Sequence, residues 1–361
     1  MKVALVYDRI NKFGGAERVL GVLHEMWPEA PVFTSVYVPA GAPWANGWDI
    51  RTSWLQNIPG AKNNHESFGW LMPLLFESLD LSGFDVIISL TSEAAKGVIT
   101  HSGQLHVCYL LTPTRYLWSH DKEYLNDIPG LIRPCAFLVQ SALRRWDFVA
   151  AQRPDSIITI SDLIRKRCEK YYRRQSEVVY PPVVLKEEGR RKKEEGEYYL
   201  VVSRLVPYKR IGLAIEACNW LKENLVVVGS GTDEARLKAM AGSTVKFAGN
   251  LTDGELVEYY REAKALLMPQ EEDFGLTAVE ALNCGTPVIS YRNSGAAEVI
   301  ESGKTGFLFD QQTVKSLVGA IQSCEVSPRP RVGAKLAAEK FSENKFKETF
   351  LKRIEELWEK H

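Results

Sequence analysis

The sequence predicts an α/β protein of two doubly wound domains, each a parallel sheet covered on both faces. Short apolar runs of the kind that form buried strands recur along the chain and alternate with helical stretches. The chain has 361 residues, about the length of two ordinary domains. Its composition, 45% hydrophobic and 25% charged, is that of a globular protein with a large core.

The first domain is expected over residues 1–185. It opens with an apolar strand, which leads into a loop that carries Gly14 and Gly15 and then into a helix. This first strand is expected at 3–7, and further apolar runs with helical stretches between them predict strands at 84–90, 105–111 and 156–160.

The segment 186–197 has no apolar residue, and we interpret it as a linker, although an exposed helix or hairpin within one domain has the same composition. The βα alternation restarts after it, which predicts a second domain over 198–335. The helical stretch 336–361 is expected to return to the first domain. Strands of the second domain are predicted at 199–203, 225–229, 245–249, 265–269 and 287–291.

Charge and cysteine usage exclude several classes of protein. The formal net charge is zero, whereas a dedicated nucleic-acid binder usually has a basic imbalance. The six cysteines show no metal-ligand or redox spacing, so we expect free thiols in a reducing compartment. The N-terminus does not have the pattern of a signal peptide, and no apolar run is long enough to span a membrane. These observations predict a cytoplasmic protein.

An acidic segment at 269–290 is the most specific motif. Glu272 and Glu280 are eight positions apart, so on a helix their carboxylates would face the same way. The first turn of a helix expected from Leu276 would offer unpaired backbone N–H groups to an anion or to sugar hydroxyls. A simpler interpretation is that Glu272 or Asp273 caps the helix and that Glu280 is solvated.

This segment resembles the donor-site motif of retaining GT-B glycosyltransferases of the glycosyltransferase family 4 type, in which two glutamates flank an internal Phe-Gly. The resemblance implies the GT-B fold, two Rossmann-like doubly wound domains that face a central cleft. It also implies that Glu280 binds the ribose of a nucleotide sugar and that Glu272 binds the hexose. Four residues would help Glu272 through their backbone: Phe274, Gly275, Leu276 and Thr277.

Two cations, Arg204 and Lys209, follow the first predicted strand of the second domain. Fixed positive charge there would stabilise a departing diphosphate more in the transition state than in the ground state. The family that this chain resembles has the same pair of cations. A basic loop on the protein surface would have the same sequence pattern. Because the chain has no Asp-x-Asp motif, the pair favours an enzyme that needs no metal ion and no cofactor.

Glycines at several strand ends are weaker signals. Gly14 and Gly15 would let the backbone approach a ligand in the first domain. By resemblance, the nucleotide would lie near the turn after the predicted strand 225–229 and near the end of the predicted strand 245–249. Tight turns alone would also explain these glycines. The implied binding residues are Ser203, Gly229, Gly231, Asn250 and Leu251.

The stretch 106–120 resembles a subgroup, the bacterial and archaeal mannosyltransferases that assemble O-antigen-type glycans, with Arg115 as a substrate-binding residue. This resemblance predicts GDP-mannose as donor. Leu111 stands where the family often has a histidine that contacts the sugar, so a UDP-sugar or a 6-deoxy sugar such as dTDP-rhamnose remains an alternative donor. His101, His106 or His120 could replace that histidine.

The sequence therefore predicts a retaining hexosyltransferase that acts on a glycan or lipid-linked glycan. Three alternatives remain: a nucleotide-sugar epimerase or phosphorylase on the same architecture, a non-enzymatic sugar-binding protein, and a nicotinamide dehydrogenase. The third is disfavoured because the dinucleotide fingerprint is missing after the first strand.

Residues 131–174 combine basic and aromatic side chains, a combination that suits contact with an anionic membrane at the inner face of the cell. A solvated helix face with buried aromatic residues explains the pattern equally simply.

Overall fold

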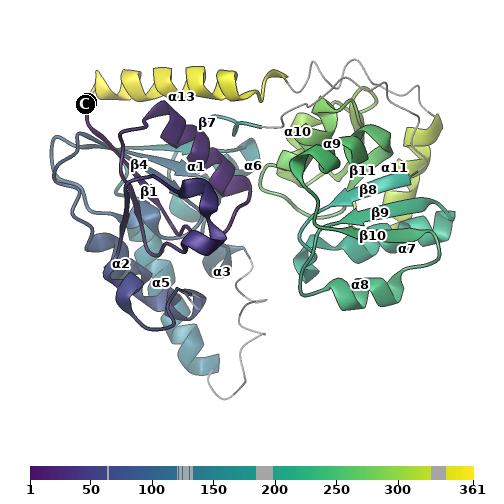
Figure 1. Cartoon of the computed structure of the whole chain (residues 1–361), viewed down its shortest axis with the longest axis horizontal. Coiled ribbons are helices and arrows are strands. Elements are labelled where there is room, and N and C mark those ends of the chain that lie inside the picture. Colours follow the sequence, from purple (N-terminus) through teal and green to yellow (C-terminus); the bar gives the residue numbers. More distant parts are fainter. Residues whose placement is uncertain are drawn as a thin grey trace. The chain divides into compact units, whose positions relative to one another are not determined.

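The computed structural model describes residues 1–62, 65–119, 121, 124, 130, 133–183, 198–326 and 339–361. The chain divides into two compact units (Figure 1). The first comprises Met1–Pro182 with Phe346–His361, and the second comprises Val183–Lys345. The predicted linker at 186–197 lies outside the described residues.

The first unit is built on a parallel sheet with the strand order β3-β2-β1-β4-β5-β6-β7 in its described part. The strands β1, β4 and β5 are buried along their whole length, which explains their continuous apolar sequences. The strands are β1 Val3–Tyr7, β2 Val32–Thr34, β3 Ile50–Thr52, β4 Val86–Thr91, β5 Leu105–Leu110, β6 Ser156–Thr159 and β7 Glu177–Val178.

Helices and 3₁₀ turns surround this sheet. The helices are α1 Gly15–Met26, α2 Met72–Glu77, α3 Arg115–Trp118, α5 Arg133–Ala150, α6 Asp162–Tyr172 and α13 Glu343–Trp358. The 3₁₀ turns are η1 Pro39–Gly41, η2 Pro43–Ala45, η3 Trp54–Asn57, η4 His65–Leu71 and η5 Ala95–Gly97.

The C-terminal helix α13 packs on the first unit. Phe346, Phe350 and Ile354, spaced four residues apart, form its buried stripe. The ring of Phe350 lies 5.4 Å from that of Tyr109 on β5 and 6.3 Å from that of Trp27. Burying each such side chain contributes about 1.5–3 kcal/mol, so these contacts attach the end of the chain to the first unit.

The second unit has a parallel sheet with the order β10-β9-β8-β11-β12-β13 in its described part. Its strands are β8 Tyr198–Val202, β9 Asn224–Val228, β10 Val245–Gly249, β11 Ala263–Met268, β12 Val288–Tyr291 and β13 Gly306–Phe309. Its helices and turns are η6 Pro207–Lys209, α7 Ile211–Leu221, α8 Glu234–Met240, α9 Asp253–Glu262, α10 Leu276–Asn283, η7 Gly295–Val299 and α11 Val314–Val326.

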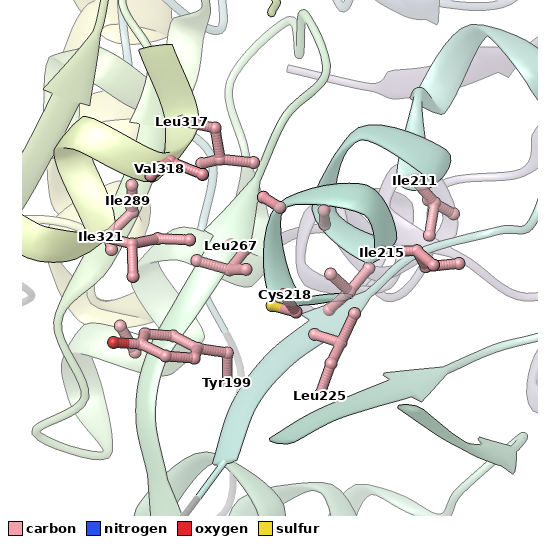
Figure 2. Close-up of a cluster of buried hydrophobic side chains, with 14 of the residues drawn as sticks. Tyr199, Ile211, Ile215, Cys218, Leu225, Leu267, Ile289, Leu317, Val318 and Ile321 are labelled. Carbon is pink, nitrogen blue, oxygen red and sulfur yellow. The ribbon is translucent and has the colours of Figure 1, made fainter. Parts of the chain in front are cut away.

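One face of this sheet packs against α7 and α11 (Figure 2). The sheet contributes Tyr199, Leu225, Leu267 and Ile289, all 1% exposed or less. The helices α7 and α11 cover them with apolar side chains, Ile211, Ile215 and Cys218 from α7 and Leu317, Val318 and Ile321 from α11. This core makes the sheet a fixed platform for the loops at its edge.

Both sheets confirm the predicted fold class, two doubly wound α/β units. In each, the strand order reverses at one point, between β1 and β4 in the first unit and between β8 and β11 in the second. Ligands of doubly wound sheets bind outside the carboxyl ends of the strands at such a reversal. The segments that follow β8 and β11 are therefore the first place to look for a site.

None of the helices in the described parts of the chain is long and apolar enough to cross a bilayer. All six cysteines are free, and Cys135 is the exposed one.

Candidate active site

A buried ion pair occupies the reversal point of the second sheet. Lys209, in η6 after β8, is 7% exposed. Its Nζ lies 2.5 Å from Oε1 of Glu272, in the loop after β11. β8 and β11 are neighbouring parallel strands, so their carboxyl ends bring together two residues that are 63 positions apart. The pair supplies both a fixed cation and a carboxylate to a ligand.

Three contacts fix the position of Glu272. Its backbone N–H donates to Oγ of Ser294 at 2.9 Å, and its carbonyl accepts from the N–H of Gly295 at 2.7 Å. Gln270 donates from Nε2 to Oε1 of Glu272 at 2.9 Å. Lys209 and Gln270 share Oε1, so the other carboxylate oxygen has no partner among the described residues and can accept hydrogen bonds from a ligand.

Gly295 is required where it stands. A Cβ atom there would lie 2.2 Å from the carbonyl oxygen of Asp273, which no side chain tolerates. The close approach lets the segment after β12 support the segment after β11. Ser294 and Gln270 are therefore part of the site, and the sequence analysis missed both.

Helix α10 starts as predicted, at Leu276. Its N-cap is Gly275, with a φ of 90°. The N–H of Ala278 donates to the carbonyl of Gly275 at 2.9 Å, whereas the N–H groups at the start of a helix, here those of Leu276 and Thr277, have no acceptor within it and suit hydroxyls or an anion. Phe274 is buried, and its ring packs edge-on against Phe341 at 5.5 Å. The N-cap position itself belongs to Gly275 and not to Glu272 or Asp273.

Glu280 lies inside α10 and is 6% exposed, so it is not the solvated residue of the simpler interpretation. Its Oε2 accepts a hydrogen bond of 2.9 Å from the hydroxyl of Tyr260 on α9. Tyr260 is fully buried. A buried carboxylate is costly unless it is hydrogen-bonded, so Tyr260 stabilises Glu280 in this position.

Arg204 is exposed at the end of β8, after the half-buried Ser203. Its Nη2 donates a hydrogen bond of 2.6 Å to the hydroxyl of Tyr208. The ring of the same tyrosine lies 5.4 Å from Nζ of Lys209. Tyr208, which the sequence analysis did not single out, thus contacts both predicted diphosphate ligands.

The predicted glycines of the second unit are explained by backbone packing. Gly229 has a φ of 124°, and a Cβ there would lie 2.0 Å from the carbonyl oxygen of Ser203. A Cβ on Gly231 would lie 2.2 Å from the carbonyl oxygen of Leu205. Asn250 accepts a hydrogen bond of 3.1 Å from Ser230, which links the ends of β9 and β10. Leu251 follows directly, half-buried. A role in nucleotide binding stays a prediction.

Gly14, Gly15 and Arg115 belong to the first unit. Gly14 is the N-cap of α1 and has an extended backbone, so its conformation does not itself demand glycine. Arg115 opens α3, which is anchored from within the unit. Thr114 and Trp118 donate to the buried carboxylate of Asp147 at 2.8 and 2.7 Å.

Two of the three proposed substitutes for a histidine at position 111, His101 and His106, do not suit that role. His106 is fully buried, with Nε2 2.8 Å from Oγ of Ser89. Burial lowers its pKa to about 3, so it is neutral. His101 precedes β5 and Leu111 follows it, so the two residues lie at opposite ends of this strand. His120 lies outside the described residues.

Residues 185–347 match the model of a protein family, "Glycosyl transferases group 1". The match falls on the part of the chain that forms the second unit. The chain as a whole also has the fold of GT-B glycosyltransferase structures. HepE of Anabaena, in a complex with UDP and glucose, superposes with a TM-score of 0.72 at 18% identity, over 98% of this chain and 99% of that one. The lipopolysaccharide-biosynthesis glycosyltransferase WaaG has a TM-score of 0.63 at 16% identity, over 94% and 95%.

Curated relatives share only part of their length with this chain. The D-inositol 3-phosphate glycosyltransferase of Acidothermus cellulolyticus is 34% identical over 34% of this chain and 32% of its own. The amylovoran biosynthesis glycosyltransferase AmsK of Erwinia amylovora is 30% identical over 41% and 40%. A GDP-mannose-dependent phosphatidylinositol monomannoside mannosyltransferase of Mycolicibacterium smegmatis is 30% identical over 36% and 38%. The matches span two-fifths or less of these proteins.

Proposed function

We propose that the chain is a glycosyltransferase that moves a hexose from a nucleotide-sugar donor to a hydroxyl of a glycan or lipid-linked glycan, with retention of anomeric configuration. The observation that carries the proposal is the buried Lys209–Glu272 pair at the reversal point of the second sheet. It provides a cation for the diphosphate beside a carboxylate for the hexose. The match of residues 185–347 to the model of glycosyl transferases group 1 supports the same activity.

Each donor group has a proposed partner. Glu280 accepts hydrogen bonds from the ribose hydroxyls, and Arg204 with Lys209 binds the diphosphate. Glu272 and the first N–H groups of α10 bind the hexose. Lys209 is largely buried, and a charge acts more strongly where water is excluded. We propose that this cation and Arg204 replace a metal ion, so that no cofactor is needed.

The proposed reaction starts with cleavage of the bond between the anomeric carbon and the diphosphate oxygen. The bonding electrons go to the diphosphate, whose growing charge Lys209 and Arg204 stabilise, and an oxocarbenium-like sugar forms. The acceptor hydroxyl attacks from the face that the diphosphate leaves and passes its proton to the departing oxygen. This front-face attack needs no covalent nucleophile from the protein.

The proposed donor is GDP-mannose. The resemblance of residues 106–120 to mannosyltransferases supports it, as does the GDP-mannose dependence named for one relative. A competing choice is a UDP-sugar, since HepE was solved with UDP and glucose. Leu111, 9% exposed, is an apolar residue that suits a 6-deoxy sugar such as that of dTDP-rhamnose.

A thermal-shift panel with EDTA present tests the donor. It uses GDP, UDP, ADP and dTDP, each alone and with its common sugars. A ligand at a hundred times its Kd adds about 2.7 kcal/mol to the free energy of unfolding. We expect a selective shift with GDP and GDP-mannose. A shift with another nucleotide alone would reassign the donor, and no shift with any of them would contradict the proposed function.

We further propose that the protein contacts anionic membrane at the inner face of the cell through the first half of α5. There Phe137, Leu138 and Val139 are 56%, 69% and 46% exposed, and Arg145 lies on the same side of the helix as Leu138. Exposed apolar side chains beside basic ones favour an anionic lipid surface.

Other parts of the segment 131–174 are engaged within the unit. Arg144 pairs with Asp121, and Arg174 donates to backbone carbonyls such as that of Pro154. Tyr172 is fully buried. The proposed lipid surface is therefore narrower than the predicted one.

Flotation with vesicles that contain phosphatidylserine tests the surface. The double variant Phe137→Ser with Leu138→Ser should lose most of its binding. Charge reversal at Arg144, which pairs within the unit, is the control and should have a smaller effect. Equal flotation of the Phe137/Leu138 variant and the unchanged protein would contradict the membrane proposal.

A further inference from the structure

The hydrogen bond between Tyr260 and Glu280 joins two helices behind the proposed nucleotide site. Tyr260 is on α9, directly before β11, and Glu280 is on α10, directly after it. The hydroxyl of Tyr260 lies 2.9 Å from Oε2 of Glu280, and both residues are at least nine-tenths buried. Thr286 donates from its hydroxyl to the carbonyl of Tyr260 and so holds the C-terminal end of α9.

The chemistry of the two groups sets the direction of this bond. A tyrosine hydroxyl stays protonated at neutral pH and donates, whereas an ionised carboxylate only accepts. One oxygen of Glu280 is thereby directed toward α9. The bond also restricts the rotation of the carboxyl group about its last side-chain bond, because turning it would break a hydrogen bond between two buried groups.

A fixed carboxylate plane matters for one kind of ligand in particular. Two vicinal hydroxyls, such as those of ribose, can each donate to one carboxylate only if its lone pairs point in set directions. If the carboxylate could rotate, ordering it would reduce the affinity for the diol.

We propose that Tyr260 is a positioning residue that orients Glu280 for the two hydroxyls of the donor's ribose. The proposal rests on the proposed function, because it takes Glu280 as the ribose ligand. In this role Tyr260 does not touch the substrate itself, and its effect is confined to recognition of the ribose.

The variant Tyr260→Phe removes one oxygen atom and keeps the ring. Tyr199→Phe is the matched control, because Tyr199 is also a buried tyrosine of the second unit and donates to a glutamate, Glu325, at 3.0 Å. Tyr199 belongs to the core on the α7 and α11 face of the sheet, where its side chain is drawn in Figure 2.

Calorimetry on the full chain measures the affinity for a nucleoside diphosphate and for its 2′-deoxy analogue. GDP is used first, and UDP if the thermal-shift panel selects it. The unchanged protein should bind the ribose form about tenfold more tightly, the equivalent of one hydrogen bond to a charged group. In Tyr260→Phe this ratio should fall at least threefold. In Tyr199→Phe it should stay as in the unchanged protein.

Each other outcome has a definite meaning. An unchanged ratio in Tyr260→Phe overturns the proposal, while retained nucleotide binding leaves the proposed function intact. Equal weakening of both ligands overturns it too, because that result indicates a general packing role. If the unchanged protein binds none of the nucleotides, the proposed function fails and the role of Tyr260 fails with it.

Discussion

Replacing Lys209 by Met tests the proposed chemistry most directly. Methionine keeps most of the volume of the buried side chain but removes the charge that lies 2.5 Å from Glu272. Two effects are expected. Losing one charge-stabilising group from the transition state should lower kcat by about a hundredfold or more. The free energy of unfolding should fall by about 1–3 kcal/mol, because Glu272 keeps its bond from Gln270 but loses its cation.

The size of the stability loss follows from the exposure of the pair. The side chains of Lys209 and Glu272 are 9% and 17% exposed. Breaking a fully buried pair costs about 3–5 kcal/mol, and an exposed pair contributes at most about 1 kcal/mol. The exposure of this pair lies between these two cases, so the expected loss of unfolding free energy is about 1–3 kcal/mol.

Lys264→Met is the matched control. Lys264 pairs with Glu223 at 2.6 Å in the same unit, but it lies near the start of β11, away from the carboxyl edge of the sheet. We expect it to lose stability and keep its kcat. The assays are initial rates of sugar transfer at saturating donor, and urea unfolding. If folded Lys209→Met turns over within threefold of the unchanged protein, the assigned role of Lys209 is wrong.

Three further predictions follow from single residues. Gln270→Leu removes a hydrogen bond to Glu272 and also a buried oxygen, Oε1, that has no partner among the described residues. It should lower kcat/KM about tenfold without loss of stability or of GDP affinity, and weaker GDP binding would contradict this role. Gly229→Ala places a Cβ 2.0 Å from a carbonyl oxygen, so the free energy of unfolding measured in urea should fall by about 2 kcal/mol or more. The control is Gly319→Ala on α11, where a Cβ would meet open space. This variant should raise the free energy of unfolding by about 0.5–1 kcal/mol. Burial lowers the pKa of His106 to about 3, whereas the unfolded chain takes up this proton below about pH 6.5. The free energy of unfolding should therefore fall by about 1.4 kcal/mol per pH unit from pH 6.5 toward 3. The variant His106→Gln should lack this slope. Parallel curves of unfolding free energy against pH for the two proteins would refute the lowered pKa of His106.

The sequence predicted the strands β8, β9, β11 and β12 of the second unit well because they are largely buried. A fully buried parallel strand needs apolar residues at every position, and a run such as that of β9, Asn224–Val228, is visible without any alternation. The strands β2, β3, β7 and β13 were missed. They have two to four residues each, and β3, β7 and β13 are partly exposed, so neither length nor pattern distinguishes them from loops.

The same contrast holds within the site. Glu272 and Glu280 were found from one short segment, because their spacing and the Phe-Gly between them form a local pattern. The groups that hold them come from elsewhere. Ser294 is 22 residues from Glu272, and Tyr260 is 20 residues from Glu280. The pairing of β11 with its parallel neighbours brings these residues together, and this pairing cannot be predicted from a local sequence pattern.

The basic segment 131–174 illustrates a different limit. A count of charges treats Arg144, Arg165 and Phe137 as parts of one surface. In the structure Arg144 and Arg165 pair with acidic residues of the unit, whereas Phe137 is exposed. Pairing depends on which residues the fold places within 4 Å, so composition predicts the charge of a segment but not the part that faces a lipid surface.

The two carboxylates of the site are held by different kinds of donor, and the difference matches the proposed chemistry. Glu272 lies beside a cation, whereas Glu280 lies beside the neutral hydroxyl of Tyr260. A cation is useful where negative charge grows during the reaction, which is at the diphosphate oxygen next to the hexose. The ribose keeps the same charge throughout, so its ligand needs a fixed direction and no compensating charge. The arrangement therefore places its buried positive charge at the part of the donor where the proposed reaction changes charge.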